Sequence, residues 1–312
     1  MALSENNLIS AYGDGPMKPS FAIVGGGRVG TALGLHLARA GYPCVGVACT
    51  TRASAQKAAA LIGEGVASDT PWEITPTANI VFITTPDSTI SHVCEQIDTH
   101  KGFAPEAVVL HCSGALPSTI LTVTSGKKAA TGSLHPLQSI AGNDPDRNPF
   151  AGIVMAVEGT PRAVDTATTI GADLGATCFT IHTEAKMLYH AGAVVASNYL
   201  VTLCDAVFVL LEESGIDRNH AFDIIWPLLS GTLENIKTVG IPQALTGPVA
   251  RGDAPIIKAH LQEIKTRKPD LLPVYRVMGL HTITVALAKG TITEAQAKKL
   301  RNVFDEKGGS GE

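Results

Sequence analysis

The sequence predicts an α/β fold: an N-terminal Rossmann-type, doubly wound and mostly parallel sheet, followed by an all-α domain. Its 312 residues are enough for two domains of ordinary size. From Ser20 onward, short apolar runs alternate with helical segments, a pattern typical of parallel α/β sheets. After about Glu184 the strand-like runs stop, and long segments of helical periodicity take over.

Apolar runs that mostly end in Gly, Pro, Thr or Ser are the predicted strands. They are residues 21–24, 44–49, 80–84, 108–112, 130–134, 153–157 and 178–181. We therefore assign residues 20–183 to the α/β domain and residues 184–306 to the helical domain. Residues 1–19 and 307–312 are polar and Gly-containing, and we expect them to be flexible tails.

Composition excludes several classes of protein. The chain has 24 Lys and Arg against 28 Asp and Glu, a formal net charge of -4, and no basic run interleaved with aromatics. We therefore expect no nucleic-acid partner. The six cysteines show neither a CxxC nor a Cys/His spacing, so no disulfide framework and no metal site is predicted. With no signal-peptide pattern at the N-terminus, a cytoplasmic location fits best.

The segment 191–211 is long and apolar enough to be tested as a membrane span. It contains Asn198 and Asp205, and a central Asp costs roughly 2.5–3.5 kcal/mol on insertion scales. Its Ala and Gly content makes it only mildly hydrophobic. We interpret it as a helix buried in protein, and we expect no membrane partner.

A glycine-rich motif follows the first predicted strand and opens a helical segment. It satisfies G-x-G-x-x-G and consists of Gly25, Gly26, Gly27, Arg28, Val29 and Gly30. In a dinucleotide site the first Gly permits the tight turn, the second lets the backbone approach the pyrophosphate, and the third lets helix and strand pack closely. The strand, motif, helix and second strand follow in the order that such a site requires. The alternative is a Gly-rich turn without a ligand.

The end of the second strand indicates which dinucleotide is bound. NAD sites place an acidic residue about 20 residues after the first Gly, but none occurs here between Asp14 and Glu64. Thr51, Arg52 and Ser54 stand there instead. A guanidinium and hydroxyls suit a 2′-phosphate, so we predict NADP(H) with Arg52 as the main contact. The alternative is that Arg52 lies at the solvent-exposed start of a helix and contacts no cofactor.

Polar residues end the next three predicted strands, where ligands bind in open α/β sheets. Thr85 and Pro86 follow the strand at 80–84 and are expected near the cofactor. Ser113 and Gly114 follow the strand at 108–112, and His135 follows the one at 130–134. We expect these residues near the nicotinamide and the substrate. For His135 the alternative role is to order its loop.

The helical domain supplies further candidates. His190 and Ser197 lie seven positions apart and thus on one helix face, with Asn198 about 80° round from His190. Polar groups on an apolar helix need partners, which makes them candidates for a site or for satisfied core positions. Thr246 and Arg251 lie in a loop where Asp253 is placed to cap the next helix. A cation at Arg251 suits a substrate carboxylate or the cofactor.

Five motifs carry a resemblance that covers about residues 20–300: GGGRVG with Arg52, HCSGAL, SLHPLQSI, YHAGAVVASNYL and LTGPVARGD. Together they resemble a bacterial group of Rossmann-like proteins with a C-terminal helical domain of the 6-phosphogluconate dehydrogenase type. That group is described as NADP- or coenzyme-F420-dependent oxidoreductases. More distantly the chain is similar to β-hydroxyacid dehydrogenases, ketopantoate reductase and pyrroline-5-carboxylate reductase.

The distant resemblance implies roles for individual residues. Ser113 matches the substrate-binding Ser of the β-hydroxyacid dehydrogenases, and residues 135–139 match their small-residue loop. Their catalytic Lys aligns with His190, and their Asn with the neighbourhood of Ala193 and Val194. A His remains able to act as the general acid. The resemblance also implies a homodimer formed through the helical domain.

These features together predict an NADP(H)-dependent oxidoreductase acting on a small carbonyl or imine compound in the cleft between its domains. His190 would give the proton, while Asn198 and Ser113 would orient the substrate. Two alternatives remain open at this stage: an NADP(H)-binding sensor without turnover, and a coenzyme-F420-dependent NADP reductase.

Overall fold

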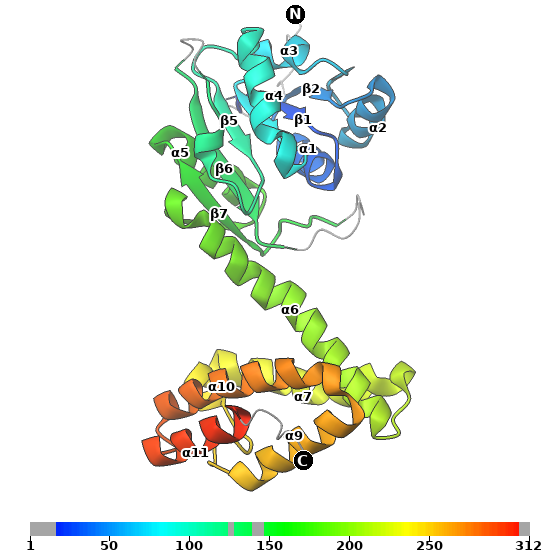
Figure 1. Ribbon diagram of the computed structural model, residues 1–312. Helices are drawn as coiled ribbons and strands as arrows, with labels where there is room; N and C mark the ends of the chain where they lie inside the picture. Colours follow the sequence, from blue (N-terminus) through cyan, green and yellow to red (C-terminus); the bar gives the residue numbers. More distant parts are fainter. Residues whose placement is uncertain (1–16, 124–127, 139–146, 306–312) are drawn as a thin grey trace, which may run out of the picture. The chain divides into compact units, whose positions relative to one another are not determined.

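The computed structural model describes residues 17–123, 128–138 and 147–305. It divides into two compact units, the first ending at Val195 and the second beginning at Ala196. That boundary lies within helix α6 (Lys186–Glu213), which is drawn in light green in Figure 1. Most of the two predicted tails lies outside the described residues.

One sheet forms the centre of the first unit, in the order β3-β2-β1-β4-β5-β6-β7-β8. Every pair of neighbours is parallel except β6 and β7, which are antiparallel. The strands are β1 (Phe21–Val24), β2 (Cys44–Ala48), β3 (Val66–Ser68), β4 (Ile80–Ile83), β5 (Val108–His111), β6 (Ala130–Pro136), β7 (Val154–Gly159) and β8 (Thr177–Thr180). The predicted mostly parallel sheet is therefore confirmed, with the addition of the short edge strand β3.

Helices cover both faces of this sheet. Phe21 and Ile23 of β1 belong to the core cluster that includes α1 (Arg28–Arg39), α2 (Arg52–Ile62) and α5 (Pro161–Asp173). The alternate residues Ala22 and Val24 belong to the opposite cluster, packed with α4 (Asp87–Thr99) and next to the short α3 (Pro71–Ile74). Because both faces of the central strands are buried, their sequences are continuous apolar runs.

The strand order reverses between β1 and β4. From β1 the chain first continues outward to β2 and β3, and then returns to the other side of β1 to form β4, β5 and β6. Loops at the carboxyl ends of β1 and β4 therefore diverge to opposite sides. A crevice opens at such a switch point, and ligands of open α/β sheets bind there.

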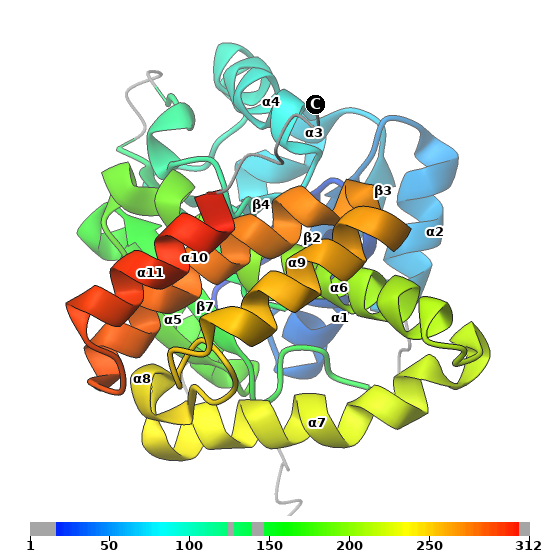
Figure 2. The same ribbon diagram turned by 60° about the horizontal axis from the view of Figure 1, so that its bottom comes forward.

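The second unit is helical. Besides the remainder of α6 it contains α7 (Arg218–Val239), α8 (Ile241–Ala244), α9 (Ala254–Arg267), α10 (Leu272–Lys289) and α11 (Glu294–Asp305). Figure 2 shows α9, α10 and α11 packed together, around a core that includes Ile257, Leu261, Ile283, Leu300 and Phe304. The predicted all-α second domain is confirmed.

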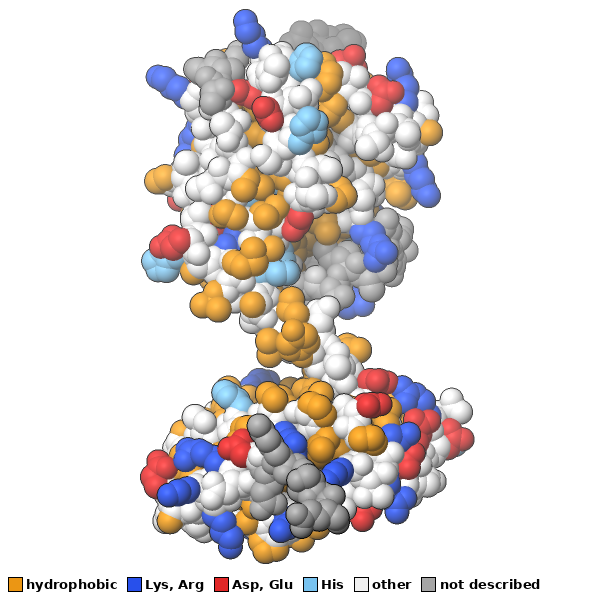
Figure 3. Space-filling model, viewed as in Figure 1, with side chains coloured by type: hydrophobic (Ala, Val, Ile, Leu, Met, Phe, Trp, Pro, Cys, Tyr) orange, Lys and Arg blue, Asp and Glu red, His pale blue; other side chains and the backbone are white. Residues whose placement is uncertain are grey.

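The expectation that residues 191–211 form a helix buried in protein is wrong for this chain. The segment is helical, but Lys186 is the buried residue of α6, and hydrophobic side chains lie exposed along the helix (Figure 3). Of the described helices, Thr183–Glu213 and Pro269–Lys289 are long and apolar enough to cross a membrane by length and composition.

Candidate functional site

The glycine-rich loop between β1 and α1 is shaped by close backbone contacts. Gly25 has φ +112°, and a Cβ there would lie 2.7 Å from the backbone of Thr84 and Thr85. A Cβ on Gly30 would collide with the carbonyl oxygen of Gly25 and with Thr84 Oγ1. A Cβ on Gly27, in contrast, would meet no atom within 4 Å. The loop therefore packs tightly at Gly25 and Gly30 and is open at Gly27, as backbone approach by a ligand requires.

A cavity of about 900 Å³ opens at this loop. Of the predicted cofactor contacts, its lining includes Gly25, Gly26, Gly27, Arg28, Val29, Ser54, Thr85 and Pro86. It also includes residues that the sequence did not indicate, namely Cys49, Thr50, Asp69, Trp72, His92 and Gln96. The start of α1 faces the cavity without a side-chain cap, so its first N–H groups can bind an anion.

One side-chain oxygen at the cavity has no partner. Thr84 Oγ1 donates a hydrogen bond to the carbonyl of Gly25 over 2.7 Å. The next hydroxyl, Thr85 Oγ1, is buried and has no hydrogen-bond partner among the described residues. A buried hydroxyl without a partner costs free energy unless a ligand satisfies it. The open Gly27, the uncapped helix and this hydroxyl fit a dinucleotide.

The residues after β2 divide between two places. Thr51 caps α2: its Oγ1 accepts from Ser54 N over 3.2 Å and donates to Ser54 Oγ over 2.9 Å. Arg52 is exposed and lines a separate, smaller pocket with Glu73. Arg28 is the arginine that lines the large cavity, and Asp69 brings a carboxylate to it from beyond β3.

Ser113 lies in the turn after β5, and its hydroxyl is engaged within the protein. Ser113 Oγ donates to Asp87 Oδ2 over 2.8 Å and accepts from the backbone N–H groups of Ala115 and Leu116 over 3.2 and 3.0 Å. The side chain thus builds the turn and ties it to the first residue of α4. Gly114, the next residue, presents bare backbone beside two histidines.

His135 and His190 converge on Gly114. A Cβ placed on Gly114 would lie 2.6 Å from His135 Nε2 and 2.9 Å from His190 Nδ1, so only glycine fits between the two rings. The ring centroids are 6.4 Å apart. His190 Nδ1 is buried and has no hydrogen-bond partner among the described residues. Burial, followed by the charges of Lys186 and His190, lowers the pKa of His135 to about 4.

A buried ion pair fixes the start of α6 on the sheet. Lys186 Nζ lies 2.9 Å from Glu158 Oε1 of β7, and each side chain is 1% exposed. The Glu158 carboxylate also accepts hydrogen bonds from Ser118, Ser133 and Thr183. Although burial alone would raise the pKa of Glu158, the hydrogen bond from Ser118 and the charge of Lys186 lower it to about 2.

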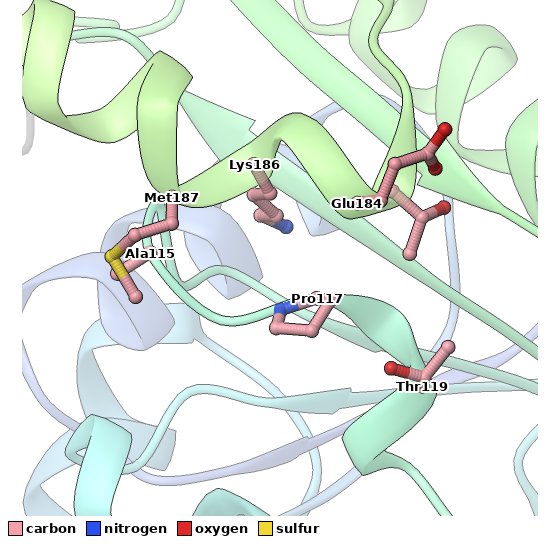
Figure 4. A pocket seen from close by; sticks show the side chains of 7 residues that line it. Ala115, Pro117, Thr119, Glu184, Lys186 and Met187 are labelled. Atoms are coloured by element: carbon pink, nitrogen blue, oxygen red, sulfur yellow. The ribbon is translucent and has the colours of Figure 1, made fainter.

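Beside this ion pair lies a pocket of about 360 Å³. In Figure 4 the ammonium of Lys186 points toward Pro117, between Met187 and Thr119. Lys186 is not among the residues predicted from the sequence, because the resemblance aligned the dehydrogenase Lys with His190. Lys186 stands four residues before His190, about one helical turn. This spacing places both residues on the same face of α6 and could have indicated Lys186 from the sequence.

The other predicted residues lie in the second unit, whereas His190 belongs to the first. Ser197 Oγ donates to Asn198 Oδ1 over 2.8 Å, and both residues are exposed on α6. Thr246 and Arg251 lie in the loop between α8 and α9. Asp253 caps α9 as predicted, accepting from the N–H of Ile256.

Two family descriptions match the sequence. Residues 11–136 match a Rossmann-like domain, and residues 153–282 match a domain of unknown function, DUF2520. The N-terminal segment is thus similar to Rossmann-like domains and the C-terminal segment to DUF2520 domains. No protein with a curated description matches it.

Several solved structures share the fold. TM1727 of Thermotoga maritima is 26% identical, with 86% of this chain and 99% of that chain covered and a TM-score of 0.67. A proposed NADP oxidoreductase of Bacteroides fragilis is 22% identical, with 86% and 98% covered and a TM-score of 0.66. The Plasmodium falciparum pyrroline carboxylate reductase with NADP bound is 11% identical, with 93% and 100% covered and a TM-score of 0.54. These structures therefore share the fold of this chain.

Proposed function

We propose that the protein is an NADP(H)-dependent oxidoreductase that transfers hydride between the nicotinamide and a small carbonyl or imine compound. The observation that carries this proposal is the glycine-rich loop at the strand-order switch, with its open Gly27, uncapped α1 and buried Thr85 hydroxyl. The fold shared with NADP-associated oxidoreductases supports it.

In this mechanism the chain binds the cofactor, orients the substrate and moves a proton. The nicotinamide, when bound, supplies or accepts the hydride. The N–H groups at the start of α1 would hold the pyrophosphate. Thr85 Oγ1 would donate a hydrogen bond to the bound cofactor. His190 gives a proton to the reacting oxygen or nitrogen as hydride arrives at carbon.

The preference for NADP(H) rests on charge at the 2′ side of the cavity. The end of β2 carries no carboxylate to receive a ribose 2′-hydroxyl. Arg28 lines the cavity, and Arg52 lies between Thr50 and Ser54, two residues that also line it. Either guanidinium suits a phosphate dianion.

The proposal includes a homodimer in the cytoplasm. Large apolar side chains are exposed in the second unit on α6, α7 and α10, more than a monomer usually leaves in water. They are Tyr199, Leu200, Val201, Phe222, Ile224, Trp226, Leu228, Leu233, Ile236, Val239, Val274, Val277 and Met278. Light scattering should give a mass of two chains for the parent and of one chain for Leu228→Asp.

The experiment that tests the function is a titration of the purified protein with NADPH and NADH, followed by nicotinamide fluorescence. We expect NADPH to bind at least tenfold more tightly. Arg28→Met and Arg52→Met each test one cation, because a charge-assisted hydrogen bond contributes about 1.5–3 kcal/mol. Lys57→Met on the exposed face of α2 is the matched control. If neither dinucleotide binds, the oxidoreductase proposal fails.

A further inference from the structure

Tyr189 directly follows the turn of α6 that the buried ion pair fixes. Its hydroxyl lies 2.9 Å from His135 Nδ1, and the two rings meet edge to face with centroids 5.7 Å apart. Phe179 of β8 packs against the other side of the phenol, 6.0 Å between centroids. The Tyr189 ring is therefore held between β8 and His135.

This contact favours one tautomer of His135. A neutral imidazole has one N–H donor and one acceptor nitrogen, and the bond made by one nitrogen decides the state of the other. Burial raises the pKa of Tyr189, so the phenol keeps its proton. Among the described residues no second partner of the Tyr189 hydroxyl is found, so donation to His135 Nδ1 is the arrangement that uses its proton. With the phenol as the donor, His135 carries its own proton on Nε2.

Nε2 is the nitrogen that faces Gly114. It lies 2.6 Å from the position of a Cβ on that residue, on the same side as His190 Nδ1. The backbone N–H groups of Ala115 and Leu116 are already bonded to Ser113. In this arrangement the protein offers an imidazole N–H at Gly114.

We propose that Tyr189 positions His135 as a neutral Nε2–H donor to the reacting atom, and that the substrate is therefore a carbonyl compound and not a protonated imine. This inference rests on the proposed function. A carbonyl oxygen has lone pairs to accept the N–H at any pH. A protonated imine has no lone pair on its nitrogen, so it cannot accept this N–H.

The tautomer can be measured by ¹⁵N NMR of the histidines in the full chain without dinucleotide. We expect pyrrole-type Nε2 and pyridine-type Nδ1 signals for His135 at pH 7, and loss of this single tautomer in Tyr189→Phe. Tyr199→Phe, an exposed tyrosine farther along α6, is the matched control and should change nothing. An Nδ1–H tautomer, or a protonated His135 at pH 7, would overturn the proposal.

The substrate class is tested with two probes of the same ring size on the NADP⁺-loaded protein. Cyclopentanone should shift the His135 Nε2–H signal, whereas pyrrolidinium should not. A response to pyrrolidinium, or to neither probe, would overturn the carbonyl assignment. A protein that shows the expected tautomer but binds no dinucleotide would instead count against the proposed function, so the two failures are distinguishable.

Discussion

Replacing Lys186 by Met removes one partner of the ion pair that joins α6 to the sheet. Both side chains are 1% exposed, and the two charged atoms are 2.9 Å apart. Breaking a buried pair from one side costs about 3–5 kcal/mol, because the remaining charge is left without compensation. Glu158 keeps the hydrogen bonds from Ser118, Ser133 and Thr183. We therefore expect the lower end, about 3 kcal/mol of unfolding free energy.

Urea unfolding measures this loss, provided that the signal comes from the first unit. The chain has two tryptophans, Trp72 and Trp226, so the series is made in a Trp226→Phe background in which Trp72 reports alone. With a slope of about 2 kcal/mol per molar urea, the midpoint should fall by about 1.5 M. Lys18→Met is the control, because the Lys18–Asp173 pair is about a third exposed and contributes at most ~1 kcal/mol.

The reasoning would be refuted if Lys186→Met unfolded at the same urea concentration as Lys18→Met. The buried pair would then contribute no more than an exposed one. A double variant, Lys186→Met with Glu158→Gln, should recover part of the loss, since it removes both charges together. If the double variant loses more unfolding free energy than the two single variants together, Lys186 does not stabilise the protein through this ion pair.

Three further predictions concern the glycine loop, the general acid and pH. Gly27→Ala should keep the parent's thermal midpoint yet bind NADPH at least tenfold more weakly, whereas Gly30→Ala should lower the midpoint itself, because only its Cβ meets protein atoms; equal effects of both on binding and midpoint would contradict this. His190→Ala should lower kcat by about 10²–10⁴ with an unchanged NADPH Kd, and unchanged turnover would remove His190 as the acid. The pKa of Glu158 in the folded protein, about 2, lies below its ordinary value of 4.5, so the charge of Glu158 contributes about 3 kcal/mol to the unfolding free energy above pH 4.5, and this contribution is lost as pH falls toward 2. The difference in urea midpoint between the parent and Glu158→Gln should therefore shrink over that range. A constant difference would show that the charge of Glu158 does not stabilise the fold.

The fold could be predicted wherever burial imposes a pattern on consecutive residues. β1 and β4 are buried on both faces and read as unbroken apolar runs, FAIV and IVFI. β3 was missed because it is three residues long, lies at the sheet edge and exposes Val66. α6 was recognised as a helix, but its environment was not, because hydropathy alone does not say what covers an apolar surface.

The site was predictable to the extent that it is local in sequence. The glycine motif can be recognised in the sequence because tight turns and close packing restrict its positions to glycine. Trp72 and Gln96 reach the cavity only through the packing of α3 and α4, and nothing in their own segments indicates it. Glu158 and Lys186 stand 28 positions apart and resemble ordinary surface residues until β7 and α6 bring them together.

The ion pair also decides where the chain can be divided. A cut between residues 183 and 184, where the change in sequence texture suggests a border, would leave Glu158 in the sheet and discard the ammonium that neutralises it. A self-sufficient nucleotide-binding fragment must therefore carry the first turns of α6. The same holds for exchange of domains between related genes. A crossover just after β8 would separate Glu158 from Lys186, whereas a crossover farther along α6 would keep both residues in one protein.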